Sequence, residues 1–123
     1  MKAVFLGEKP HRLSYVYSDA VIDRIAAEAE LDRTYYNKAD VLANKEAFAD
    51  TEYIFSTWGM PVMTEEEITA CFPSLRAVFY AAGSVQTFAR PFLNVGVKVF
   101  SAWAANAVPV TEYTVAQIVL ANK

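Results

Sequence analysis

Residues 72–123 decide the fold of this chain: FPSLRAVFYAAGSVQTFARPFLNVGVKVFSAWAANAVPVTEYTVAQIVLANK. The β-branched and aromatic residues from Leu75 to Ala81 predict a strand, which leads into the small residues Ala82-Gly83-Ser84. A short helix within 84–94 and a second strand over 97–101 are expected to follow. The segment ends in a long apolar helix, which we expect to begin between Asn106 and Pro109.

The preceding residues continue this alternation. Apolar or aromatic runs predict three more strands, over 2–7, 31–37 and 51–58, and the polar second one is expected at an edge. Helices are expected after Ser18, over 44–50, and from the Thr64-Glu65-Glu66-Glu67 capping box to Cys71, with a loop over 8–14. Strands that alternate with helices predict right-handed crossovers. We therefore expect an α/β, flavodoxin-like fold: a five-stranded parallel sheet in the order 2-1-3-4-5, with helices on both faces.

Composition and charge exclude several classes of protein. The 123 residues are 54% hydrophobic and 20% charged, which is enough for one domain with a buried core. The net charge is −3 and the basic residues are scattered, so we expect no nucleic-acid partner. No apolar run reaches the roughly 18 residues of a membrane span. The single cysteine, Cys71, excludes an internal disulfide and is expected to be buried, and the chain is expected to be cytoplasmic.

The last helix is apolar on every side. From Val110 to Leu120 the apolar residues spread around the whole cylinder, and such a helix must be buried on all sides. A five-stranded domain can cover only one side. We therefore expect residues 1–105 to form a substrate-binding domain and residues 106–123 to begin a helix that protrudes from it. The helix is expected to lead into a further domain of about 100–200 residues and to mediate self-association.

Three segments carry a resemblance to a known family. They are Leu75-Arg76-Ala77-Val78, Ala82-Gly83-Ser84-Val85-Gln86 and Asn106-Ala107-Val108-Pro109-Val110-Thr111-Glu112. In order and spacing they resemble the substrate domain of the D-isomer-specific 2-hydroxyacid dehydrogenases, whose pattern is L-K-x-I-x-x-x-G-x-G-x-D, then N-x-x-x-V-A-E. The two glycines of the family are Ala82 and Ser84 here, and its aspartate is Gln86.

The resemblance implies a small 2-oxo or 2-hydroxy acid as substrate. Its carboxylate would be held by the backbone N–H groups of Gly83 and Ser84, and Asn106 would donate its side-chain amide. The substrate pocket would be lined by Trp58, Gly59, Met60 and Trp103. Other interpretations stay open: Gly83 can serve a tight turn, Asn106 can cap a helix, and the tryptophans can pack in the core or between domains. The topology points to the same turns, because ligands of such sheets bind beyond the carboxyl ends of the strands.

The redox chemistry itself is expected outside these residues. The chain has four glycines and no G-x-G-x-x-G, so it lacks the dinucleotide-binding fingerprint. The resemblance implies that NAD or NADP, and a catalytic His, Glu and Arg, belong to a Rossmann domain beyond the long helix. We expect no catalytic role for His11, no metal site, no activity of these residues alone, and a homodimer through the C-terminal helix. The alternative is a free-standing flavodoxin-like module that binds or dimerises without catalysis.

Overall fold

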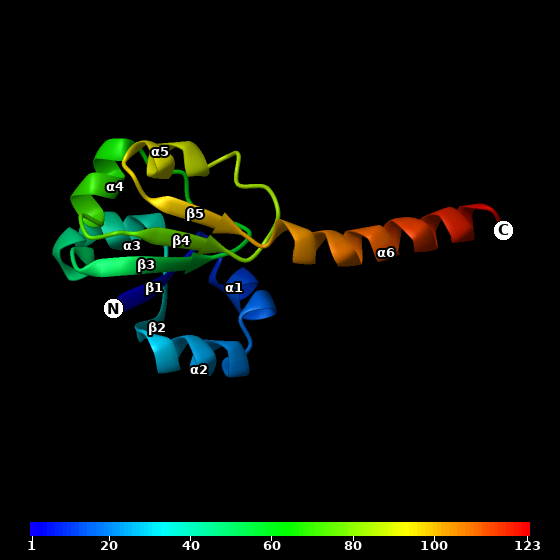
Figure 1. Cartoon of the computed structure of the whole chain (residues 1–123), viewed down its shortest axis with the longest axis horizontal. Coiled ribbons are helices and arrows are strands. Elements are labelled where there is room, and N and C mark those ends of the chain that lie inside the picture. Colours follow the sequence, from blue (N-terminus) through cyan, green and yellow to red (C-terminus); the bar gives the residue numbers. More distant parts are fainter.

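The computed structural model describes residues 1–123 and is built on a five-stranded sheet (Figure 1). The strands are β1 (Lys2–Leu6), β2 (Glu30–Tyr36), β3 (Thr51–Ser56), β4 (Ala77–Tyr80) and β5 (Lys98–Ser101). They lie in the order β2-β1-β3-β4-β5, and every neighbouring pair is parallel. The predicted flavodoxin-like arrangement is confirmed, including the edge position of the polar strand β2.

Helices cover the two faces of the sheet unequally. The chain forms α1 (Pro10–Val16), α2 (Asp19–Glu28), α3 (Lys38–Ala43), the 3₁₀ helix η1 (Lys45–Phe48), α4 (Glu65–Cys71), α5 (Ala89–Asn94) and α6 (Trp103–Ala121). Helices α3, α4 and α5 lie on one face, and α1 and α2 lie on the other (Figure 1). The first face holds a cluster of 18 buried apolar residues, whereas the second holds only four, namely Phe5, Leu13, Tyr17 and Ile22.

Successive side chains of a strand point to opposite faces of the sheet, so one strand can contribute to both clusters. In β1, Val4 and Leu6 join the large cluster, whereas Phe5 between them joins the small one. In β4, Val78 belongs to the large cluster, and Phe79 points to the opposite face because successive side chains alternate across a strand. The face shared with α1 and α2 is therefore aromatic in β3, β4 and β5.

Several element boundaries differ from the prediction. Residues 8–14 were expected as a loop, but Pro10 opens α1 and Leu13 anchors it in the small cluster. The short helix expected over 44–50 is the 3₁₀ helix η1, whereas α3 before it was not predicted, although Asn37 and Asp40 form a capping box at its start. The last helix begins at Trp103 rather than at 106–109.

The capping box predicted for α4 is confirmed. The Thr64 hydroxyl oxygen accepts from the Glu67 N–H at 3.2 Å, and the Glu67 carboxylate accepts from the Thr64 N–H at 2.8 Å. The Lys38 ammonium lies 2.7 Å from the same carboxylate and, with the Thr64 N–H, lowers the pKa of Glu67. These contacts tie the start of α4 to α3.

Replacing Thr64 by Ala should therefore lower the free energy of unfolding by about 1 kcal/mol, because the Glu67 N–H loses its acceptor. Thr64→Ser keeps the acceptor and should retain most of the stability. Thr69→Ala is the matched control, since the Thr69 hydroxyl bonds only to the Glu65 carbonyl inside the helix and Ala favours a helix. Urea unfolding monitored by circular dichroism gives the three values. Equal losses for Thr64→Ala and Thr69→Ala would contradict the role of the cap.

Tyr17 is the one polar side chain inside the small cluster. Its hydroxyl donates to the Ser56 carbonyl at 2.9 Å, and the ring packs on Phe5 and Phe55. Burial raises the pKa of the Tyr17 phenol far above its usual range. The neutral phenol is therefore a structural hydrogen-bond donor between α1 and the end of β3.

Replacing Tyr17 by Phe should lower the free energy of unfolding by about 1 kcal/mol at neutral pH, since one buried hydrogen bond is lost. Above the unfolded pKa of about 10 the unfolded chain releases the phenolic proton while the folded chain keeps it. The native Tyr17 contribution then falls as the pH rises, by at most about 1.4 kcal/mol per pH unit. The difference between the two proteins, measured by urea unfolding from pH 7 to 11, should narrow above pH 10. A constant difference would refute the assignment.

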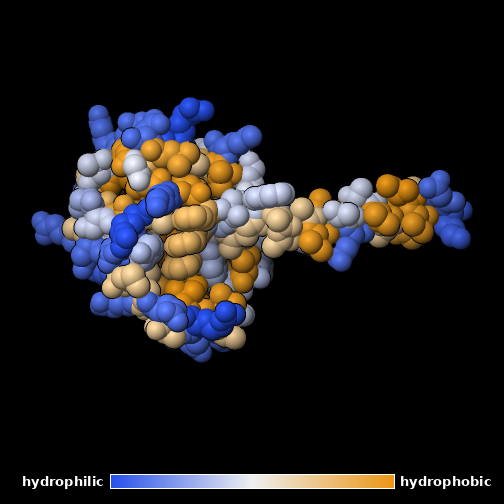
Figure 2. All heavy atoms as spheres, viewed as in Figure 1, coloured by the Kyte–Doolittle hydropathy of each residue, from blue (hydrophilic) through white to orange (hydrophobic).

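Helix α6 projects from the domain into solvent (Figure 1), and none of its residues is buried. Figure 2 shows apolar atoms along most of the projection and hydrophilic atoms at its tip. Pro109 lies inside the helix, and because proline has no N–H it interrupts the ladder of hydrogen bonds there. The predicted exposure of an apolar helix is confirmed, and α6 covers no part of its own sheet.

Candidate functional site

The turn after β4 lies at the carboxyl edge of the sheet and is held by hydrogen bonds. The Ala81 N–H donates to the Ser56 carbonyl at 2.8 Å, which continues the pairing of β4 with β3. On the other side, the Ser101 hydroxyl lies 3.0 Å from the Ala82 carbonyl and 2.5 Å from the Gly83 carbonyl. The turn is thereby held to both neighbouring strands.

Gly83 and Asn106 come together at this edge. A Cβ atom at Gly83 would lie 3.1 Å from Nδ2 of Asn106, so the glycine makes room for the asparagine side chain. Asn106 is at the end of the first turn of α6, where its N–H donates to the Ala102 carbonyl at 2.9 Å. Ala102 occupies the N-cap position, so the interpretation of Asn106 as a helix cap is wrong.

The backbone donors of the turn are free. The N–H groups of Gly83 and Ser84 make no hydrogen bond within the chain, while the Gly83 carbonyl accepts from the Ser101 hydroxyl. The first N–H groups of α6 also have no partner in the helix, which gives its start a partial positive charge. The short helix expected within 84–94 forms over Ala89–Asn94, so its first residue is five positions beyond Ser84. The positive end near the turn is therefore that of α6.

Gly59 lies in a turn, whereas the two predicted pocket tryptophans are exposed to solvent. Gly59 has a φ of +94°, which favours glycine, and its carbonyl accepts from the Glu8 N–H at 2.8 Å. This pairing places the end of β3 beside the segment between β1 and α1. Trp58 is 45% exposed and Trp103 is 68% exposed, so packing in the domain core is excluded for both. Met60, expected to line the substrate pocket, is buried in the large cluster instead.

Other reactive groups lie away from the Gly83 turn. Cys71 is buried at the end of α4, and burial raises the pKa of its thiol, which makes it a poor nucleophile. His11 is exposed on α1 and packs against Tyr15 with ring centroids 6.1 Å apart. No three His, Cys, Asp or Glu side chains gather where they could hold a metal ion. None of the helices combines the length and the hydropathy that a membrane-spanning helix requires.

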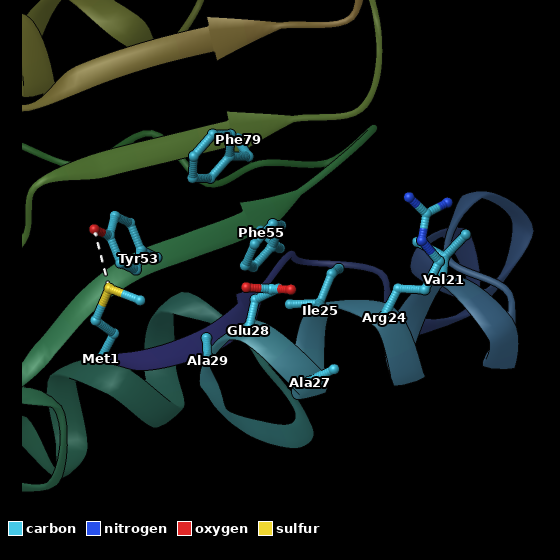
Figure 3. Close-up of a pocket in the computed structure, with 10 residues that line it drawn as sticks. All are labelled: Met1, Val21, Arg24, Ile25, Ala27, Glu28, Ala29, Tyr53, Phe55 and Phe79. Carbon is cyan, nitrogen blue, oxygen red and sulfur yellow. Dashed lines mark hydrogen bonds between the residues drawn. The ribbon is translucent and has the colours of Figure 1, made fainter.

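A groove of about 730 Å³ lies on the face of the sheet, between α2 and strands β3 and β4 (Figure 3). It is lined by Met1, Val21, Arg24, Ile25, Ala27, Glu28, Ala29, Tyr53, Phe55 and Phe79. None of the seven predicted site residues belongs to it. This groove was not predicted, although the alternation of Tyr53 and Phe55 in one strand is a signal for an aromatic face.

Comparison with known proteins supports the fold and goes no further. No protein-family model matches the chain, and no curated protein matches it. A crystal structure from Burkholderia pseudomallei, described as a "Putative pilus assembly-related protein", superposes with a TM-score of 0.52 at 15% identity, over 83% of this chain and 78% of that one. At this identity the likeness concerns the fold alone, and the resemblance to the dehydrogenases stays a prediction.

The contact between Gly83 and Asn106 can be tested by a double-mutant cycle. The φ of Gly83 lies outside the left-handed region, so Gly83→Ala should stabilise the fold by about 0.4–1 kcal/mol where space allows. We expect that gain in the Asn106→Ala background, and a smaller gain or a loss in the native background, where the new methyl group meets Nδ2. Urea unfolding of the four proteins measures the coupling free energy. Additive effects would show that the two residues do not touch.

Proposed function

We propose that this chain is the substrate-binding half of an oxidoreductase that transfers a hydride between NAD(P)H and a small 2-oxo or D-2-hydroxy acid. One observation carries the proposal. The free N–H groups of Gly83 and Ser84 and the amide of Asn106, the residues named by the family resemblance, lie together at the carboxyl edge of the sheet. This is the edge at which parallel α/β sheets bind ligands.

The chemistry of these groups suits a carboxylate. Backbone N–H groups and the Nδ2 amide are donors, and the small residues of the turn let an anion approach the backbone. The start of α6 adds positive potential from a helix of 19 residues. No acidic side chain is among these groups. In this proposal Trp58 and Trp103, both exposed beside the edge, would form apolar walls for the rest of the substrate.

These contacts alone would bind weakly. A hydrogen bond to a charged group contributes about 1.5–3 kcal/mol, and association costs about 4 kcal/mol or more. Two or three such bonds leave a dissociation constant in the millimolar range or above. Tight binding, exclusion of water and the placement of the hydride donor would require a second domain. In this proposal that domain follows α6 and supplies the NAD or NADP site together with the catalytic His, Glu and Arg.

A second candidate function rests on the exposure of α6. A free-standing flavodoxin-like module could use this apolar helix to associate with a second copy, without catalysis. The two candidates differ at the Gly83 turn, because a pure association module has no need for free donors there. They can therefore be separated by a ligand titration.

We expect pyruvate to shift the backbone amide resonances of Gly83 and Ser84 in an NMR titration, with a dissociation constant of millimolar order or weaker. Methyl pyruvate, which lacks the charge, should shift them far less. Asn106→Ala should weaken binding severalfold. Gly83→Val should abolish it, because the branched side chain blocks the amides and displaces Asn106. Shifts elsewhere that leave Gly83 and Ser84 unchanged, or equal shifts with the ester, would refute the proposed carboxylate site.

A further inference from the structure

The face of the sheet beside α2 is only partly covered across β3, β4 and β5. The rings of Phe55, Phe79 and Phe100 form a stacked ladder, with centroids 5.2 Å apart at each step and interplanar angles of 17° and 12°. Tyr53 extends the ladder, 6.1 Å from Phe79. Phe100 is 50% exposed. We call these four residues the aromatic face. Parallel sheets normally have both faces covered by helices, so the aromatic face lacks a helix.

The groove beside this face has the form of a helix-binding site. The side chains of Val21 and Ile25 from α2 form one wall, and Tyr53, Phe55 and Phe79 form the floor (Figure 3). Eight of its ten lining residues are hydrophobic. A helix packed beside α2 at the usual interaxial distance of about 8–10 Å would occupy the groove and contact the ladder.

Helix α6 supplies the matching apolar surface. Between Trp103 and Ala121 its only charged residue is Glu112. At 3.6 residues per turn, Val108, Val115, Ile118 and Val119 fall on one side, and Val110, Tyr113 and Leu120 fall on the other. The part beyond Pro109 is about 18 Å long, similar to the length of the strands that it would cover.

The connection to β5 keeps α6 off its own sheet. Only Ala102 separates β5 from α6, and the Ala102 N–H is bonded to the Tyr80 carbonyl at 3.0 Å. A helix that covers the sheet must run back against the strand direction, and such a reversal takes a loop of about 2–6 residues. With one residue the helix continues outward from the carboxyl edge instead (Figure 1).

The exposed surface area of the chain exceeds that of a compact monomer by about the area of one protein–protein interface. A compact monomer of 13.7 kDa exposes about 6,600 Å². This chain exposes 7505 Å², which is about 900 Å² more than that expectation. A standard protein–protein interface buries about 800 Å² on each partner. The excess is thus of the size that a stable dimer removes.

We propose that two copies of this chain exchange α6, so that the segment beyond Pro109 of each copy packs in the groove and on the aromatic face of the other. A two-fold axis perpendicular to the strands places the two carboxyl edges toward each other. Each α6 then runs antiparallel to the strands of its partner, as a crossover helix does. The exchange closes the assembly at two copies, because each copy offers one helix and one partly covered face.

This interface does not depend on the proposed carboxylate site. The docked segment lies beyond Pro109, while Gly83 and Asn106 stay at the start of the helix. Loss of pyruvate binding would leave the dimer intact, and loss of the dimer would leave the amides of the turn free. The two proposals can therefore fail separately.

Sedimentation velocity of the full chain should show a dimer whose dissociation constant rises at least tenfold in Phe100→Asp. Leu93→Asp is the matched control, because Leu93 is 55% exposed on α5, on the opposite face of the sheet, and it should leave the dimer unchanged. The variant Val115→Asp/Leu120→Asp, which charges both sides of α6, should raise the dissociation constant at least as much. All these positions are exposed, and circular dichroism verifies that each variant folds.

A mixing experiment separates helix exchange from pairing of two α6 helices. Phe100→Asp keeps an intact helix, and Val115→Asp/Leu120→Asp keeps an intact aromatic face, so a mixture of the two should regain one of the two exchanged contacts and form heterodimers. A monomeric native chain at 100 μM, an unchanged dimer in Phe100→Asp, or a mixture that stays monomeric would each overturn the proposal.

Discussion

The single residue between β5 and α6 constrains the rest of this structure. Because Ala102 is bonded to Tyr80, the helix begins at the carboxyl edge and cannot turn back over the sheet. The same short connection brings the side chain of Asn106 against Gly83. One local constraint thus has two results, a group of hydrogen-bond donors at the edge and an apolar helix outside the domain.

Helices cover one face of the sheet more completely than the other. On the face of α3, α4 and α5, the large cluster is closed by buried rings such as Phe88 and Phe92. On the face of α1 and α2, the small cluster ends near Phe55, and the ladder continues through the half-buried Phe79 to the exposed Phe100. Exposed apolar surface of this extent marks sites of association. The partly covered face and the projecting helix have the same cause: the helix that follows β5 does not pack on the sheet.

Much of the fold could be predicted from the sequence because it depends on local patterns. The apolar run of β1, the capping box at Thr64 and the buried Cys71 are all where the sequence analysis placed them. The errors came from weaker local signals. Pro10 opens a helix whose only buried anchor is Leu13, and the Asn37 box precedes a helix of six residues. Short helices of this kind are stabilised mainly by tertiary contacts, so their boundaries are hard to predict.

The sequence by itself determined the parallel order of the sheet, the small residues of the Gly83 turn and an apolar helix with nothing to cover it, because each follows from spacing along the chain. Only the tertiary structure decided that Asn106 lies on Gly83 rather than at a helix cap, that Met60 is buried in the core, and that four aromatic rings form one partly exposed face. These facts join residues distant in sequence, and their positions depend on strand register and on where one helix begins.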